Sequence, residues 1–159
     1  MGQINFSVPR ALAEGDDISG FSCGSQLIDS WIAMRARRAR KTGTAIVYVS
    51  FASEKLAGFY TLSSQSILRD DARGWIARNA PLQIPVILLG MMGVDREFQG
   101  QGLGHDLLLN AVRRAQSVAN QIGARALVVD PVDEKATAFY RHYGFRAIPE
   151  TTRMFARLV

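Results

Sequence analysis

A glycine-rich stretch at residues 99–104 carries the clearest chemistry in this chain of 159 residues. It reads Gln-Gly-Gln-Gly-Leu-Gly and precedes an amphipathic run that is typical of a helix. The backbone N–H groups of such a loop, together with the positive end of the helix dipole, can hold a phosphate. Glycine is needed because side chains would keep phosphate oxygens away from the amides. The stretch predicts an anion site, and a plain strand-to-helix connection is the alternative.

A run of positive charge is the second chemical feature. Five residues within 35–41 are cationic, namely Arg35, Arg37, Arg38, Arg40 and Lys41. The net charge of +5 and the isoelectric point of about 9.9 suit an anionic partner such as a nucleotide, coenzyme A or RNA. Composition does not choose among these partners, and a solvated helix face explains any single arginine equally well.

Other kinds of site are disfavoured. The glycine loop lacks the Lys-Ser/Thr ending of a P-loop and lies too late in the chain for a dinucleotide fold. The single cysteine, Cys23, cannot form an internal disulfide, and with only two histidines it makes no zinc-type cluster, so we expect no metal. The apolar stretch 84–94 is too short to cross a bilayer as a helix, which predicts a cytoplasmic protein without membrane insertion.

The elements that position these residues follow from hydrophobic periodicity. The length of the chain and its hydrophobic content of 48% predict one domain over 1–159. A helix is expected from the N-cap candidate Ser25 through the basic run to Gly43. Segments 45–51 and 56–62 predict a β-hairpin, and 67–85 predicts a loop with a short helix near Trp75.

The second half of the chain alternates strands and helices. Pro85 opens an apolar run, 86–94, that predicts a buried central strand, and a helix is expected from Leu103 to Gly123. A strand at 126–129, a helix at 134–143 closed by Gly144 and a last strand at 154–159 complete the pattern. This order predicts an α/β or mixed α+β fold in which helices pack on a sheet.

Two motifs resemble those of the GNAT N-acetyltransferases. The coenzyme loop of that family reads Gln or Arg, two residues, Gly, one residue, Gly or Ala, and Gln99, Gly102 and Gly104 match it in register. The family's second motif, on the helix after the fifth strand, is matched by Ala136, Phe139, Tyr140, Gly144 and Phe145. The resemblance spans most of the chain and implies the GNAT fold, with a central mixed, mostly antiparallel sheet and helices on both faces.

The resemblance also implies acetyl-CoA as cosubstrate and assigns it a site. The strand positions that face the pantetheine arm are Met92, Gly93 and Val94, and the pyrophosphate loop comprises Gln99, Gly100, Gln101, Gly102, Leu103, Gly104 and His105. Phe139 and Asp133 complete the coenzyme set. Many members have asparagine at the Asp133 position, and aspartate cannot donate the same hydrogen bond.

Tyr140 holds the family's position for the general acid. Acetyl transfer to an amine releases a CoA thiolate, and a thiol of this type has a pKa of about 8.5. A hydroxyl that donates a proton to this leaving group lowers the barrier. The resemblance therefore implies that Tyr140 is catalytic.

The N-terminal part is similar to the acetyltransferase toxins of toxin-antitoxin modules. The matching residues are Phe21, Cys23, Gly24, Leu27, Asp29 and Trp31, together with 58–63 in the third strand. This resemblance implies a homodimeric toxin that acetylates the amino group of aminoacyl-tRNA and is silenced by a ribbon-helix-helix antitoxin. The basic run would then bind tRNA, with Arg35 and Arg38 continuing the apolar stripe and the other three cations facing away from it.

Two further observations bear on the substrate. An α-amino group has a pKa of about 7.7 to 8.0, so an aminoacyl amine needs little deprotonation. This fits the lack of an evident general base in the sequence. Met91, however, stands where these toxins frequently carry an arginine. A GNAT enzyme that acetylates a small-molecule amine or a protein amine, and a non-catalytic CoA- or RNA-binding regulator, therefore remain alternatives.

Overall fold

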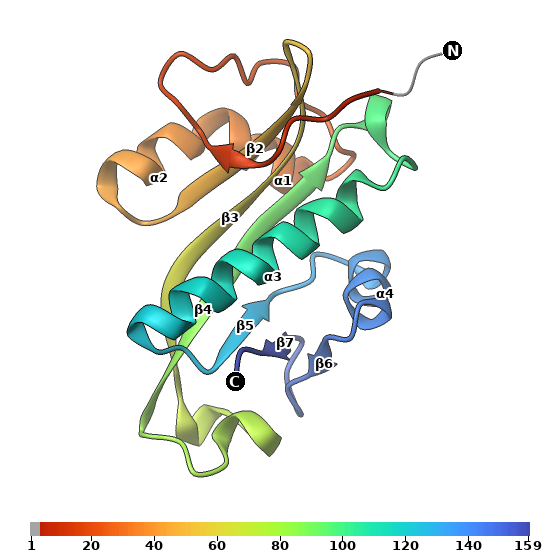
Figure 1. Ribbon diagram of the computed structural model, residues 1–159. Coiled ribbons are helices and arrows are strands. Elements are labelled where there is room, and N and C mark those ends of the chain that lie inside the picture. Colours follow the sequence, from red (N-terminus) through yellow and green to blue (C-terminus); the bar gives the residue numbers. More distant parts are fainter. Residues whose placement is uncertain (1–3) are drawn as a thin grey trace. The chain divides into compact units, whose positions relative to one another are not determined.

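The computed structural model describes residues 4–159, whose strands form a seven-stranded, mostly antiparallel sheet (Figure 1). The predicted mixed α+β class is confirmed. The chain divides into two compact units. Unit 1 comprises residues 1–63 and 91–111, and unit 2 comprises residues 64–90 and 112–159. The single domain therefore stays a prediction.

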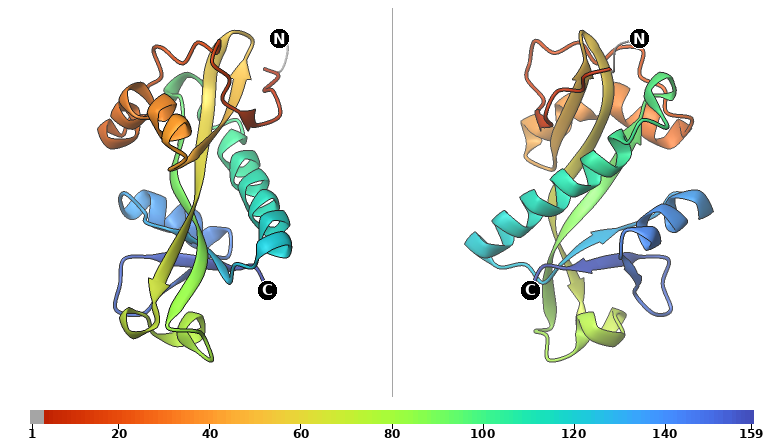
Figure 2. Two further views of the ribbon diagram at one scale, coloured as in Figure 1. Left: turned by 90° about the vertical axis from the view of Figure 1, so that its left-hand side faces the viewer. Right: turned by 45° about the vertical axis from the view of Figure 1, so that its right-hand side comes forward.

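Unit 1 is an antiparallel sheet between helices. Its elements are β1 (Arg10–Ala11), α1 (Gln26–Met34), α2 (Ala36–Thr42), β2 (Ile46–Ala52), the first part of β3 (Lys55–Leu68), the end of β4 (Gln83–Val94), η3 (Arg96–Phe98) and the first half of α3 (Leu103–Ile122). The strands are hydrogen-bonded in the order β1-β2-β3-β4. In this unit α1 and α2 cover one face of the sheet and α3 covers the other (Figure 2).

The predicted first helix is divided in two. Ser25 caps α1 as predicted, because its hydroxyl accepts a hydrogen bond from the Ile28 amide, and Gly43 ends α2 with a φ of 72°. The backbone leaves the helical path at Arg35, with φ −119° and ψ −21°. The break changes the helical phase, so the buried residues of α2 are the small Ala36 and Ala39.

Unit 2 contains a parallel strand pair and a short antiparallel edge. Its elements are the end of β3, the 3₁₀ turns η1 (Arg69–Asp71) and η2 (Gly74–Ala77), the first part of β4, the second half of α3, β5 (Ala126–Val129), α4 (Glu134–His142), β6 (Arg146–Ala147) and β7 (Met154–Arg157). The strand order is β3-β4-β5-β7-β6, with β4 and β5 parallel. Ile76, Ile84, Val128 and Phe155 lie in its apolar core.

Most predicted elements of the second half are confirmed, with two corrections. The short helix near Trp75 is η2, and Gly123 and Gly144 follow α3 and α4 with φ values of 86° and 93°. Pro85 lies inside β4 instead of opening it, at an exposed position whose carbonyl accepts from the Arg125 amide (2.9 Å). Strands β1 and β6 were not predicted, because two residues show no periodicity.

No helix within residues 4–159 has the length and apolar character needed to span a membrane. In the same range, no three or more His, Cys, Asp and Glu side chains are grouped so that they could hold a metal ion.

Candidate active site

The glycine loop of unit 1 has the backbone conformation that only glycine adopts easily. Gly100 and Gly102 have φ values of 80° and 86°, in the left-handed region. A Cβ atom at either position would meet nothing within 4 Å. Conformation, and not crowding by the protein, therefore accounts for these glycines. The open space beside them leaves room for a ligand close to the backbone.

The start of α3 supplies amide donors at the end of this loop. The Asp106 amide donates to the Gly102 carbonyl (3.1 Å), and the amides of Leu103 and Gly104 lie before this bond, where an α-helix offers no acceptor of its own. Together with the helix dipole, these amides suit an anionic group. Leu103 is buried and can offer only its backbone, whereas His105 is exposed, with Nδ1 3.4 Å from the Asp106 carboxylate.

Gln99 fixes the loop by its side chain. Its Nε2 atom donates to the carbonyls of Cys23 (2.9 Å) and Val94 (2.8 Å). Asp95, buried just before, accepts from the amides of Ser22 and Glu97, both at 3.0 Å. The side chain of Gln99 therefore has a positioning role that the motif alone does not reveal.

The end of β4 lies beyond its pairing with β5. The last residue pair joins Leu89 to Val129, so Met92 and Val94 extend past it along a strand whose N–H and C=O groups can take an extended ligand. A Cβ at Gly93 would lie 3.1 Å from Ile28 Cγ2 and 3.2 Å from Cys23 Sγ. Packing of the α1 region against β4 thus explains the glycine.

Gly58 on β3 was missed as a positioning residue. A Cβ atom there would lie 2.8 Å from Leu107 Cδ1 and 3.1 Å from Leu103 Cδ2, so glycine lets α3 approach the sheet. A glycine inside an apolar strand is the signal that could have identified it. Gly58 therefore helps to set where the first turn of α3 lies.

The residues that resemble the toxin signature pack the segment before α1 onto the sheet of unit 1. The Phe21 ring meets Phe59 edge-on at 5.3 Å, and Trp31 stacks on Phe59 at 6.4 Å. The Asp29 carboxylate accepts from the Cys23 amide (2.8 Å). Burial raises the pKa of the Cys23 thiol to about 11, so this thiol stays protonated at neutral pH.

Tyr140 lies on α4 in unit 2 with its ring packed among aromatic residues. Its exposed fraction is 8%, and the ring contacts Phe139 at 5.5 Å and Phe145 at 5.3 Å. Burial raises the pKa of the Tyr140 phenol, which keeps the proton on the oxygen across neutral pH. The residue is thus held in the protonated form that a general acid requires.

The Tyr140 hydroxyl forms no hydrogen bond within residues 4–159. None of the described buried side-chain oxygen or nitrogen atoms lacks a partner, so this oxygen is not completely enclosed. It can therefore donate its proton to a ligand that reaches it.

Asp133 is committed to the helix that carries Tyr140. Its carboxylate caps α4 by accepting from the Ala136 amide (2.7 Å). This explains why an acceptor such as aspartate suffices at a position where asparagine was expected. A contact between Asp133 and the coenzyme stays a prediction.

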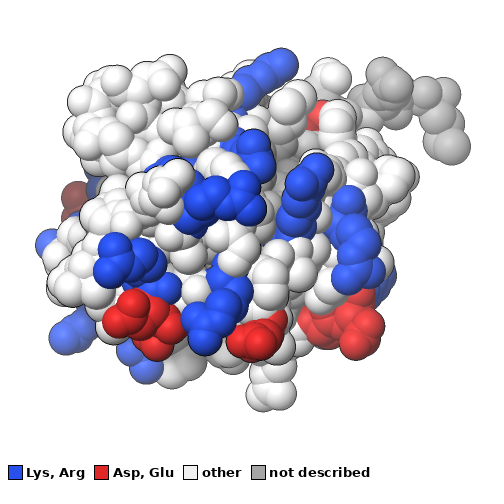
Figure 3. Space-filling model, turned by 90° about the horizontal axis from the view of Figure 1, so that it is seen from below, with Lys and Arg blue, Asp and Glu red and all other residues white. Residues whose placement is uncertain are grey.

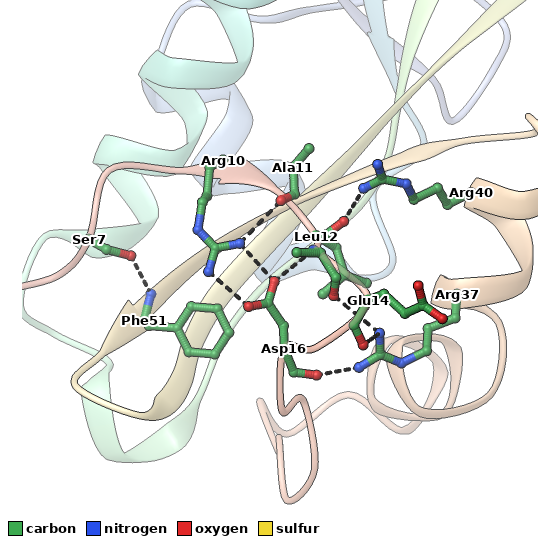
Figure 4. Close-up of polar contacts among 10 residues, drawn as sticks. Ser7, Arg10, Ala11, Leu12, Glu14, Asp16, Arg37, Arg40 and Phe51 are labelled. Atoms are coloured by element: carbon green, nitrogen blue, oxygen red, sulfur yellow. Dashed lines mark hydrogen bonds and ion pairs between the residues drawn. The ribbon is translucent and has the colours of Figure 1, made fainter.

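The basic run at residues 35–41 divides into two sets. In the first set, Arg37 donates to the carbonyls of Ala13 (3.3 Å), Glu14 (3.1 Å) and Asp16, and Arg40 donates to the Leu12 carbonyl (Figure 4). The remaining side chains form no hydrogen bond or ion pair inside the described part of the chain; they are Arg35, Arg38 and Lys41. All five cations are exposed. The expectation that Arg35 and Arg38 continue the apolar stripe was wrong, because the break at Arg35 turns Ala36 and Ala39 inward.

Comparison with known proteins identifies the family. Residues 66–147 match the acetyltransferase (GNAT) domain. The chain belongs to the GNAT acetyltransferases. The prediction of a GNAT fold and of acetyltransferase activity is confirmed by this match.

This GNAT acetyltransferase resembles two curated proteins along most of its length. It is 38% identical over 144 residues to a tRNA-acetylating toxin of Mycobacterium tuberculosis (strain ATCC 25618 / H37Rv), covering 91% of this chain and 87% of that protein. It is 32% identical over 151 residues to the probable toxin TacT of Sinorhizobium fredii (strain NBRC 101917 / NGR234), covering 87% and 83% respectively.

Solved structures show the same fold. A variant of KacT superposes with a TM-score of 0.88 at 24% identity, covering 96% of this chain and 95% of that one. AtaT complexed with acetyl-methionyl-tRNAfMet superposes with a TM-score of 0.85 at 23% identity, again covering 96% and 95%. At these identities the superpositions support the fold alone.

The GNAT acetyltransferase has an apolar side chain where an arginine was expected. Met91 is half-buried and packs against the apolar cluster that contains Phe59 and Ile28. Its amide donates to the buried Thr61 hydroxyl (2.9 Å). Met91 thus extends the core of unit 1 and offers no cation to a substrate.

Proposed function

We propose that this GNAT acetyltransferase transfers the acetyl group of acetyl-CoA to the α-amino group of an aminoacyl-tRNA, and so blocks translation as the toxin of a toxin-antitoxin pair. One observation carries the proposal, which is the 38% identity over 91% of the chain to a tRNA-acetylating toxin. A ribbon-helix-helix antitoxin, a homodimer and a cytoplasmic location belong to the same proposal.

The coenzyme is held mainly by backbone groups. The amides from Gln99 to His105 bind the pyrophosphate, for which the left-handed Gly100 and Gly102 leave open space. The edge of β4 at Met92 and Val94 pairs with the pantetheine arm. Phe139 and Asp133 complete the coenzyme site from α4.

The chemical step needs a neutral amine and a proton donor. The amine nitrogen attacks the thioester carbonyl carbon, the C–S bond breaks, and CoA leaves as a thiolate that takes the Tyr140 proton. The amine's surplus proton passes to solvent, and solvent reprotonates the tyrosinate. An α-amino group with a pKa of about 7.7 to 8.0 is partly neutral at physiological pH, so the attack requires little help from a base.

Charge favours a polyanionic acceptor. The free guanidinium group of Arg38 and the ammonium of Lys41 lie exposed on α2, and the free guanidinium group of Arg35 lies exposed at the residue before it. Phosphate contacts to such groups release counterions from the nucleic acid and so strengthen binding. A small amine or a protein amine is the second candidate acceptor, and Met91 in place of an arginine is the observation that favours it.

Transfer of radiolabelled acetyl groups tests the proposal. Purified protein is incubated with labelled acetyl-CoA and a pool of charged tRNA, with uncharged tRNA as the control. We expect label in the RNA fraction only for charged tRNA, and release of that label as an N-acetyl amino acid by mild base, which hydrolyses the ester. Absence of label, or label that survives the base treatment on the RNA, would contradict the proposal.

A further inference from the structure

The positive charge of the chain is not spread evenly between its units. Unit 1 contains eight Lys and Arg against eight Asp and Glu, whereas unit 2 contains eleven against six. The whole net charge of +5 therefore belongs to unit 2, although the densest basic run belongs to unit 1. Figure 3 shows many basic side chains on the face seen from below, with most of the visible acidic side chains in a row beside them.

Trp75 is the centre of an aromatic and cationic cluster in unit 2. Its ring stacks on Phe155 with centroids 5.7 Å apart and planes 4° from parallel. Two guanidinium groups also lie over the indole, with Arg125 Cζ at 4.2 Å and Arg157 Cζ at 4.3 Å from the ring centroid. Both distances suit cation–π attraction, which is strongest for tryptophan.

The two arginines have different partners. Arg125 is half-buried and donates to the carbonyls of Trp75 (3.0 Å), Ile76 (3.1 Å) and Arg78 (2.8 Å), so it closes the end of η2. Arg157 is exposed, and its guanidinium forms no hydrogen bond or ion pair within residues 4–159. Its N–H donors are held over a rigid ring and remain available to an anion.

The residues near Arg157 and Trp75 include further arginines as well as acidic residues. Arg78 is exposed and its side chain also forms no hydrogen bond or ion pair among the described residues. Arg73 forms a loose ion pair with Glu150, at 3.7 Å between largely exposed side chains, and donates to the carbonyls of Asp70 (3.3 Å) and Ala72 (3.1 Å). The acidic neighbours along the chain are Asp70 and Asp71 in η1.

We propose that Arg157 on Trp75, together with Arg78, is a second binding surface for the phosphate backbone of tRNA, in addition to α2. This inference rests on the proposed function. A guanidinium offers a planar fork of donors that matches phosphate oxygens, and stacking fixes the fork before the ligand arrives. Duplex RNA is recognised largely through its phosphates and sugars, so the surface needs no base-specific group.

Salt-dependent binding of uncharged, fluorescently labelled tRNA tests this surface. Arg157→Gln should weaken binding several-fold and lower the slope of log K against log salt by about one unit, while Arg157→Lys keeps the charge and the slope. Arg113→Gln, which removes an equally exposed and unpaired cation from α3, is the matched control and should leave the slope close to that of the wild type.

Three results would overturn the inference. The Arg157→Gln slope could equal that of the wild type, it could equal that of the Arg113→Gln control, or the Lys and Gln variants could lose affinity equally, which would indicate packing and not phosphate contact. Acetyl transfer to charged tRNA by the wild type separates this inference from the proposed function. If transfer occurs while Arg157→Gln binds tRNA normally, only the inference fails. If the wild type binds no tRNA, both fail.

Discussion

The basic helix α2 in unit 1 and the Trp75 region in unit 2 use arginine in opposite ways. On α2 the cations are dense along the sequence, but Arg37 and Arg40 hold carbonyls of residues 12–16, and unit 1 as a whole is neutral. In unit 2 the cations are scattered along the sequence, yet their excess over acids makes up the whole net charge. Density along a sequence is therefore a poor measure of the field that a polyanion meets.

Coenzyme binding and proton donation, the two parts of the proposed chemistry, also depend on different kinds of group. The coenzyme loop in unit 1 works through backbone amides, so a side chain added at Gly100 or Gly102 should weaken coenzyme binding. The acid in unit 2 works through one hydroxyl on a buried ring, so removing a single oxygen is enough. Substitutions can therefore test the two separately.

The largest effect is expected for Tyr140→Phe. The change keeps the packed ring and removes only the proton donor, so turnover should fall by roughly 10² to 10⁴ while stability and acetyl-CoA affinity change little. Tyr143→Phe on the next turn is the control. Steady-state kinetics with charged tRNA measures both variants, and equal losses in the two, or none in Tyr140→Phe, would remove Tyr140 from the mechanism.

Gly102→Glu should weaken acetyl-CoA binding by several kcal/mol. The φ of 86° strains any side chain, and the carboxylate would face the pyrophosphate. Gly123→Glu is a matched control, because Gly123 has the same φ of 86° and equally open space at the other end of α3. Calorimetric titration should find the loss only in the first variant, and unchanged affinity there would place the coenzyme elsewhere.

The smallest effect concerns the two sets of cations in the basic run at residues 35–41. Arg35→Ala with Arg38→Ala should lower the salt slope of tRNA binding by about two units and leave acetyl-CoA affinity unchanged. Arg37→Ala with Arg40→Ala should instead lower the free energy of unfolding by roughly 1 kcal/mol per lost set of hydrogen bonds, with little change in slope. Equal slopes for the two pairs would mean that the contacts to residues 12–16 do not decide which cations bind RNA.

Local patterns in the sequence predict most of this fold and part of the site. The glycine loop, the caps at Ser25 and Gly43 and the end of α3 at Gly123 all depend on a few neighbouring residues, and the structure has each of them. Helical phase was predictable only until the chain left the helix at Arg35. The break turns Ala36 and Ala39 inward, a change of helical phase that the periodicity before Arg35 does not encode.

Contacts between distant residues account for the rest. Arg40 meets a carbonyl 28 residues away, Gln99 meets one 76 residues away, and Gly58 accommodates α3. None of these partners is marked in the sequence near the residue concerned. The resemblance to a family named Gln99 as a site residue, but only the structure gives its side chain a role in holding the loop.

A competition between acceptors shows which amine this acetyltransferase prefers. Wild-type protein is given labelled acetyl-CoA with charged tRNA, a polyamine and a peptide that has a free N-terminus, all in one reaction, and the products are separated and identified by mass spectrometry. We expect an N-acetyl aminoacyl-tRNA as the main product, with a higher kcat/KM for charged tRNA than for either other amine. Acetylation of the polyamine or the peptide while charged tRNA stays unmodified would contradict this expectation.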